Sequence, residues 1–385
     1  MASASTWSRP PSAWGSRPLA RSEESRPALF EAVPNFSEGR DLALVERLGA
    51  GRHTLDVHAD ADHNRSVITL AAVSAEALID DLLGKVAMAA EAIDLRRHSG
   101  VHPRLGAADV IPIVPLRGAG MAQASEAAHR LGRRIWQELR LPVFYYGAAA
   151  SGRRLADIRR GGLAPDEGGP DLHPSAGAVC VGARAPLVAY NIVFEGMSIP
   201  AARPLVRGMR LLPGVQALAF RMGADGIQLS MNLTRLEEAG VGPVYEAASA
   251  LAGRAGEPEL VGLCPVGAAG PGCAGGLLEA RLAAAAAGAA RVRRDGGEEH
   301  ERLAARLAAE GESLKALGTD QEAILGGAER ALALIRVIRA AGAGDPEIEA
   351  FLEAAASGFR RALGRGTERD AAARVALVDR WLAAG

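Results

Sequence analysis

The sequence predicts an α/β (α+β) fold, made of two α/β-sandwich units followed by an all-helical segment. Short apolar runs rich in β-branched residues alternate with helical stretches up to residue 263, which is the pattern of sheets covered by helices. The two units are predicted to meet near residue 184. From Leu277 onward the chain is rich in Ala, Leu, Arg and Glu and has no strand signal, so only helices are expected there.

Length, charge and cysteine content narrow the class of protein. A chain of 385 residues with 49% apolar and 23% charged residues can bury substantial cores. A net charge of -1 does not indicate binding to nucleic acid or to an anionic membrane surface. No apolar run reaches the ~20 residues that a membrane span needs. The three cysteines form neither a CxxC pair nor a disulfide framework. We therefore expect a cytoplasmic protein without nucleic-acid or membrane partners.

The N-terminal segment, residues 1–28, is rich in Ser, Arg, Pro and Ala and has no acidic residue before Glu23. Transit peptides share that composition. Two proline-rich clusters interrupt this segment, and it has no clear amphipathic pattern, so a disordered tail is the favoured interpretation.

The first unit is predicted at residues 29–184. A strand over 29–33 ends at Pro34, and Ser74 is placed to cap a long helix whose first turn contains Glu76. The apolar stripe of that helix is Leu78, Leu82, Val86, Ala89, Ala90 and Ile93. The other strands are predicted at 54–58, 66–73, 109–114, 142–146 and 178–182. The other helices are predicted at 41–48, 121–139 and 153–160.

The second unit is predicted at residues 185–266, with the same alternation on a smaller scale. Its strands are predicted at 187–194, 215–220, 227–233 and 259–263, and its helices at 200–210 and 241–251. A long irregular stretch, 161–177, precedes it and contains too many glycines and prolines for regular structure. Such a loop inside a compact protein is usually functional or disordered.

A glycine-rich stretch, residues 267–276, is predicted to be a flexible linker. It lacks the Lys-Ser/Thr continuation of a phosphate-binding P-loop. The helical domain follows at 277–385, with helices predicted at 277–293, 297–316, 319–341, 345–363 and 367–383. Because composition changes sharply across the linker, the sequence predicts that these helices can be separated from the α/β units.

The stretch His98–Pro115 contains the most concentrated chemistry in the chain. It places two histidines, an arginine and two glycines in a turn and then runs into an apolar strand. Pro103 holds His102 in an extended conformation, and His102 and Arg104 are two residues apart, so both side chains point to the same side. A base titrating near neutrality beside a fixed cation suits an anionic substrate. The alternative is an ordinary surface turn that happens to hold His and Arg.

Two further motifs change the balance between those alternatives. They are Val33-Pro-Asn-Phe-Ser-Glu-Gly-Arg40 and Asp56-Val-His-Ala-Asp-Ala-Asp-His-Asn-Arg-Ser-Val67, and Gly100-Val-His-Pro-Arg-Leu-Gly-Ala-Ala-Asp109 follows them. In this order and spacing they resemble the glutamate formiminotransferase family, the folate-dependent transferases of histidine degradation. The resemblance runs from about Phe30 to about Pro265. Bifunctional relatives carry an α-helical cyclodeaminase domain after it. The helical segment here is shorter and is either a diverged form of that domain or an unrelated module.

The resemblance implies roles for particular residues. His102 corresponds to the catalytic histidine, which can remove a proton from N5 of tetrahydrofolate and protonate the departing glutamate nitrogen. His98 is the fallback. Arg104 is expected to hold a substrate carboxylate, and Asn64 and Arg65 to hydrogen-bond a carboxylate or a pterin edge in the cleft between the units. A structural turn is the alternative for Asn64 and Arg65. The role of His58 is left open, since other members can have a carboxylate there.

A glycine-rich part of the irregular stretch resembles the folate-binding segment of the family. Glycines let the backbone approach a flat pterin closely, and backbone N–H groups can bind its edge. An ordinary surface loop is the alternative. The predicted folate-binding residues are Gly168, Gly169, Pro170, Asp171, Leu172, His173, Pro174, Ser175, Ala176 and Gly177. Ala176 replaces an aromatic residue of the family, which removes a stacking contact.

His58-x-Asp-x-Asp-His63 also has the spacing of a zinc-binding motif. A catalytic zinc site draws further ligands from elsewhere, and the neighbouring Asn64 and Arg65 fit poorly beside a cation. We therefore predict no metal.

The resulting prediction is a homodimeric glutamate formiminotransferase that uses tetrahydrofolate as a substrate. The open alternatives are a formyl-donor transferase on the same fold, a bifunctional formiminotransferase-cyclodeaminase, and a non-catalytic folate-binding protein.

Overall fold

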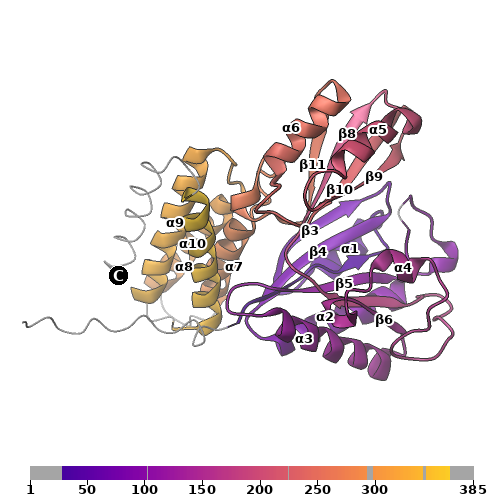
Figure 1. The fold of residues 1–385 in the computed structure, drawn as a ribbon. Coiled ribbons are helices and arrows are strands. Elements are labelled where there is room, and N and C mark those ends of the chain that lie inside the picture. Colours follow the sequence, from indigo (N-terminus) through magenta and orange to yellow (C-terminus); the bar gives the residue numbers. More distant parts are fainter. Residues whose placement is uncertain (1–27, 102, 224, 293–297, 341–343, 365–385) are drawn as a thin grey trace, which may run out of the picture.

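The computed structural model describes residues 28–101, 103–223, 225–292, 298–340 and 344–364. The predicted tail, apart from its last residue, and the predicted helix 367–383 lie outside these residues. Within them the fold is of mixed α/β class, with two sheets, each carrying helices, and a C-terminal group of helices (Figure 1). The predicted fold class is therefore confirmed. None of the described helices is both long enough and apolar enough to cross a membrane.

The first sheet has seven strands. They are β1 (Phe30–Ala32), β2 (Asn35–Phe36), β3 (Thr54–Asp60), β4 (Arg65–Ala72), β5 (Ala108–Pro115), β6 (Val143–Gly147) and β7 (Val179–Ala183). Both β1 and β2 pair with β4 on one side and with β5 on the other, so they are two pieces of one line interrupted at Pro34. Strand β3 lies beyond β4, and β7 and β6 continue the sheet in parallel beyond β5. The two-residue strand β2 is not among the predicted strands, because two residues are too few for an alternation.

Three helices pack on one face of this sheet, namely α1 (Leu42–Gly49), α2 (Ala75–Ala92) and α3 (Met121–Arg134). Ser74 caps α2 as predicted, by accepting a hydrogen bond from the Ala77 amide. The predicted helix over 121–139 is confirmed, although its end, Ile135–Leu139, is π-helical. The short helix α4 (Leu155–Arg159) packs on the opposite face, where Ile158 meets residues of β5, β6 and β7. The rest of that opposite face is available to the second unit and the C-terminal helices.

The second unit contains an antiparallel sheet of four strands in the order β11-β8-β10-β9. Their bounds are β8 (Val188–Glu195), β9 (Val215–Met222), β10 (Gly226–Leu233) and β11 (Glu257–Val261). Helices α5 (Ile199–Met209) and α6 (Val241–Ala252) cover one face, onto which β8 and β10 direct their alternate apolar residues. The other face carries the polar residues of the same strands, among them Asn191 and Gln228. Both are nevertheless buried, which shows that another part of the protein covers this face.

The C-terminal helices are α7 (Leu278–Val292), α8 (Glu298–Lys315), α9 (Gln321–Ala340) and α10 (Pro346–Leu363). They lie beside both α/β units in Figure 1. Their apolar residues and those of the second sheet form one continuous buried cluster. Ion pairs also join them to the first unit, between Arg281 and Asp56 and between Arg117 and Glu353.

The glycine-rich segment 267–276 lies within this shared core. Cys273 is fully buried, and the Tyr190 hydroxyl of β8 donates to the Pro271 carbonyl at 2.9 Å. The Gly275 amide donates to the Leu317 carbonyl at 3.0 Å, beyond the end of α8. These contacts argue against the expectation of a flexible linker, because close packing restrains the backbone that the glycine content alone would leave mobile. The predicted division into tail, two units, linker and helical domain remains a proposal.

Candidate active site

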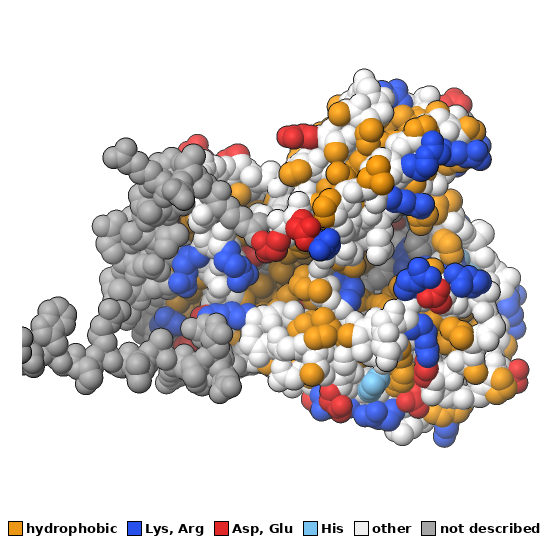
Figure 2. All heavy atoms as spheres, viewed as in Figure 1, with side chains coloured by type: hydrophobic (Ala, Val, Ile, Leu, Met, Phe, Trp, Pro, Cys, Tyr) orange, Lys and Arg blue, Asp and Glu red, His pale blue; other side chains and the backbone are white. Residues whose placement is uncertain are grey.

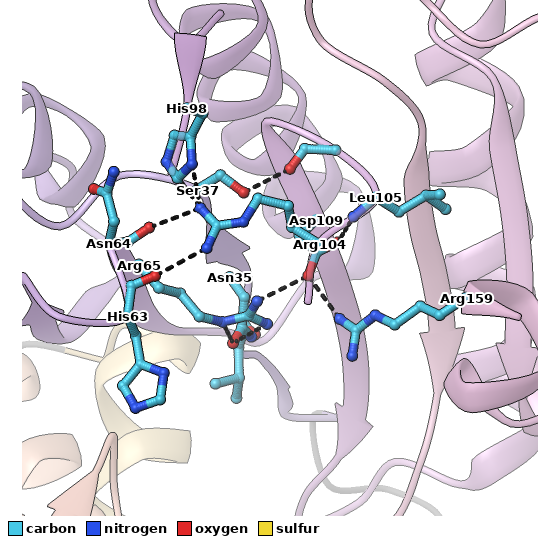
Figure 3. A network of polar contacts seen from close by, with 12 residues as sticks. Asn35, Ser37, His63, Asn64, Arg65, His98, Arg104, Leu105, Asp109 and Arg159 are labelled. Carbon is cyan, nitrogen blue, oxygen red and sulfur yellow. Dashed lines mark hydrogen bonds and ion pairs between the residues drawn. The ribbon is translucent and has the colours of Figure 1, made fainter. Parts of the chain in front are cut away.

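Three motif stretches that are far apart in the sequence meet where strands in the middle of the first sheet begin or end (Figure 3). The Ser37 hydroxyl donates to the Gly106 carbonyl at 2.8 Å, and the Ser37 amide donates to the Ala107 carbonyl at 2.8 Å. The Gly39 amide donates to the Asn64 side chain at 3.0 Å. The stretches around residues 33–40, 56–67 and 98–109 therefore form a single cluster beside the end of β2 and the starts of β4 and β5.

Asn64 holds the three stretches together. Its φ of 46° lies in the left-handed region, which asparagine tolerates better than most residues. Its side-chain oxygen accepts from Gly39, and its side-chain nitrogen donates to the Ser99 carbonyl at 3.1 Å. The predicted substrate-binding amide is thus committed to backbone on both sides, and its role in substrate binding remains a proposal.

Arg104 is directed at the turn that contains Asn64. Its guanidinium donates to the carbonyl oxygens of His63 and Asn64, at 3.0 and 3.4 Å, and contacts the ring of His98. Gly100 permits this approach, because a Cβ there would overlap both the guanidinium and the His63 carbonyl. Burial and the adjacent Arg104 lower the pKa of His98 below its usual value. His98 is therefore a neutral imidazole at pH 7, held against a fixed cation.

Arg65 is part of a buried ionic cluster behind this turn. Its guanidinium donates to the Asn35 side chain at 2.9 Å and to the Asp109 carboxylate at 2.8 Å. Arg159 donates to the same carboxylate oxygen at 2.7 Å, and the Leu105 amide donates to the other at 2.7 Å. Burial alone would raise the pKa of Asp109, but Arg65 and Arg159 outweigh it and lower this pKa. The cluster fixes the start of β5 relative to β4.

Replacing Asp109 with asparagine is expected to destabilise the fold by about 3–5 kcal/mol, since it leaves two partly buried guanidinium groups without their shared carboxylate. The pKa of Asp109 is lower in the folded than in the unfolded chain. Its contribution is therefore present above about pH 4 and is lost as the pH falls through the folded-state value. Denaturant titrations at pH 7 and at acidic pH measure both effects. Asp157→Asn is the matched control, because Asp157 also has two arginine partners, Arg154 and Arg160, but on the surface. An equal loss in both variants would contradict the argument.

The predicted folate-binding loop, residues 168–177, lies against the same turn. The Ala107 amide donates to the Ala176 carbonyl at 2.9 Å, and the Ala178 amide donates to the Leu105 carbonyl at 3.1 Å. Gly177 has a φ of 71°, and a Cβ there would overlap the Leu105 carbonyl, so glycine is required. The part of the loop over 169–172 is exposed. The structure thus brings the loop beside Arg104, while its binding of folate remains a proposal.

His102 lies outside the described residues. Figure 2 shows Lys or Arg side chains on both sides of the region where the two α/β units face each other. His58 and His63 of the first unit both reach the second unit. His58 Nε2 lies 3.5 Å from a Glu259 carboxylate oxygen, and His63 Nε2 lies 2.6 Å from the side-chain oxygen of Gln228. Among the described residues, no group of three or more His, Cys, Asp and Glu side chains could hold a metal ion.

A cavity of about 480 Å³ lies elsewhere, on the α3 side of β6. Its polar lining includes Tyr145, whose hydroxyl donates to Glu167 at 2.9 Å, and Arg153, which donates to Asp166 at 2.6 Å. Tyr145 and its neighbour Tyr146 point to opposite faces of the sheet. The cavity is therefore separated by the sheet from the face that carries α4.

Comparisons with known proteins cover the part of the chain that forms this cluster. A family model described as "Formiminotransferase domain, N-terminal subdomain" matches residues 29–184. The chain is 37% identical over 269 residues to a protein of Thermoplasma acidophilum named glutamate formimidoyltransferase, covering 62% of this chain and 88% of that protein. A protein of the same name from Streptococcus pyogenes serotype M1 is 33% identical over 267 residues, covering 62% and 89%. The formimidoyltransferase-cyclodeaminase of Gallus gallus is 36% identical over 277 residues, which span 62% of this chain but 50% of that protein.

Proposed function

This chain belongs to the glutamate formimidoyltransferase family, and from that premise we propose that it transfers the formimino group of N-formimino-L-glutamate to tetrahydrofolate. The products are 5-formiminotetrahydrofolate and L-glutamate. The observation that carries the proposal is the meeting of the three motifs and the 168–177 loop in one cluster. The long alignments to glutamate formimidoyltransferases support it.

The chemistry requires one proton to leave N5 of tetrahydrofolate and one to reach the departing glutamate nitrogen. A histidine whose pKa lies near neutrality can perform both steps in turn. We assign this role to His102, from its place in the Gly-x-His-Pro-Arg motif. His98 is a weaker candidate, since its lowered pKa and its contact with Arg104 suit a positioning role.

The contacts refine the roles of the remaining predicted residues. Arg104, Asn64 and Arg65 bind the backbone and side chains of the cluster itself, so we propose that their main task is to hold the turn. The loop residues Gly168, Gly169, Pro170, Asp171, Leu172, His173, Pro174, Ser175, Ala176 and Gly177 are proposed to contact folate, chiefly through the exposed part. We further propose a cytoplasmic homodimer, without nucleic-acid or membrane partners.

An assay of the purified full chain with tetrahydrofolate and N-formimino-L-glutamate tests the function. We expect formation of 5-formiminotetrahydrofolate, with activity unchanged after EDTA treatment and removal of metal. If EDTA treatment abolishes activity and added zinc restores it, the result would support a metal site in the His58–His63 motif instead. Turnover of N-formyl-L-glutamate in place of the formimino compound would favour the formyl-donor alternative. Conversion of 5-formiminotetrahydrofolate to the methenyl form with release of ammonia would reveal a second, cyclodeaminase activity.

A further inference from the structure

We propose that Gln228 of the second unit is a positioning residue for the transfer reaction, oriented by Glu259, and that it fixes the turn that holds Arg104. This inference rests on the proposed function for its catalytic part. It concerns a chain of contacts that begins on the polar face of the second sheet and ends at the motif turn of the first unit.

The second sheet presents a buried polar group to the first unit. Gln228 on β10 is 1% exposed and Asn191 on β8 is 6% exposed, although both lie on the sheet face opposite α5 and α6. Glu259 on β11 is paired in register with Asn191. One carboxylate oxygen of Glu259 accepts from Asn191 at 2.9 Å and from the Gln228 amide nitrogen at 3.2 Å.

Those contacts fix the orientation of the Gln228 side chain. A carboxylate only accepts hydrogen bonds, so the amino group of Gln228 must point toward Glu259. The amide oxygen of Gln228 then points toward His63, whose Nε2 lies 2.6 Å away. An oxygen at that distance requires a hydrogen on Nε2, so Gln228 determines which ring nitrogen of His63 donates. The Asp60 carboxylate, 3.8 Å from the same nitrogen, and the edge contact of the ring with Phe220 complete the surroundings.

The backbone of His63 continues the chain of contacts into the predicted site. The His63 amide donates to Asp60 at 2.8 Å, and the His63 carbonyl accepts from Arg104 at 3.0 Å. Arg104 in turn contacts His98, which begins the motif stretch 98–109. A shift of His63 therefore moves an anchor of that turn. Displacements of about 1 Å at such supports can cost up to about 100-fold in rate.

The test combines kinetics with a direct measurement on His63. Gln228→Met keeps the side-chain length but removes the acceptor for His63, and Glu259→Met removes the oxygens that accept from the Gln228 amide. We expect Gln228→Met to lower kcat at least about tenfold and to change KM less than about threefold, because positioning is lost but substrate contacts are kept. Gln216→Met and Glu257→Met are the matched controls, since both residues are exposed on strands of the same sheet. They should retain wild-type kcat.

Coupling between the two residues provides a second readout. If Glu259 acts through Gln228, adding Glu259→Met to Gln228→Met should lower kcat no further than about twofold. Additive losses would show that Glu259 acts by another route, such as direct contact with substrate. They would overturn the proposal that Glu259 acts by orienting Gln228. A wild-type kcat in Gln228→Met would overturn the positioning role. Should Gln228→Met fail to fold, the His63 N–H resonance in Glu259→Met decides, because loss of its protection from exchange supports the orientation of Gln228 by Glu259 and unchanged protection overturns it.

The hydrogen on His63 Nε2 can be observed without substrate. The chain has eight histidines, so ¹⁵N-histidine labelling gives few imidazole resonances, and His63→Gln identifies the one in question. We expect an N–H resonance protected from exchange with water in the wild type and absent in Gln228→Met. A resonance that persists in that variant would overturn the hydrogen bond. A wild-type protein with no formimino transfer would overturn the proposed function and the catalytic part of this inference. The resonance would still decide whether Glu259 and Gln228 orient His63.

Discussion

Replacing His102 with alanine is expected to lower kcat by about 10²- to 10⁴-fold, the usual cost of losing a positioned general acid–base group. Binding of tetrahydrofolate should change little, because the proposed folate contacts come from the 168–177 loop. The fold should also survive, since the sequence places His102 in a turn and outside every predicted strand and helix. Steady-state kinetics, tetrahydrofolate titration and thermal unfolding of the same sample measure these three properties.

His98→Gln is the discriminating companion variant. The lowered pKa of His98 makes its side chain neutral at pH 7, so a neutral glutamine should preserve much of the contact with Arg104. We therefore expect a far smaller loss of kcat than in His102→Ala. Near wild-type turnover in His102→Ala together with a severe loss in His98→Gln would transfer the catalytic role to His98.

Local sequence patterns predicted most of the fold because they are set by nearest neighbours. The alternation Ile227, Leu229, Met231, Leu233 gave β10, and all four side chains are buried in the core as an alternating strand requires. The same alternation places Gln228 on the other face, which local pattern alone would assign to solvent. Gln228 is buried only because the first unit covers it.

The roles of the site residues were harder to predict for the same reason. Spacing and the family resemblance gave Arg104 a substrate carboxylate as its partner, whereas the structure shows it donating to the carbonyls of His63 and Asn64. Those partners are about 40 residues away, and no periodicity encodes such a distance. Gln228 and Glu259 belong to no motif, so the only available signal was their polar character on strands of the second unit.

The glycine-rich segment shows that glycine content has two physical consequences. Glycines in 267–276 predict flexibility, but they also allow close approach. A Cβ at Gly276 would overlap the Leu260 side chain of β11, and one at Gly270 would meet the backbone of Gly242 at 2.5 Å. The segment therefore joins the second sheet to the helices as part of one core.

Truncation after Pro265 is consequently expected to abolish stable folding, contrary to the separability that composition suggests. The cut removes the glycine-rich segment 267–276 and the C-terminal helices, whose apolar residues share one buried cluster with the second unit. Leu277, Leu278 and Leu282, at most 7% exposed, are among the core residues lost. Burial of each leucine contributes about 1.5–3 kcal/mol. Losing several of them therefore removes much of the 5–15 kcal/mol that typically stabilises a domain. The truncated chain should aggregate or lose its cooperative unfolding transition, as measured by size-exclusion chromatography and calorimetry.

Leu277→Ala gives a graded version of the test, since this side chain is fully buried and the Leu277 backbone, just before α7, forms a β-bridge with Cys264. Its loss should cost about 2–5 kcal/mol. A monodisperse chain ending at Pro265, with a sharp unfolding transition and full transferase turnover, would instead show that the helices are dispensable. The second unit would then have to be stable with Leu263 and Cys264 at its end exposed, and the continuous core would be a docking surface between independently folded parts.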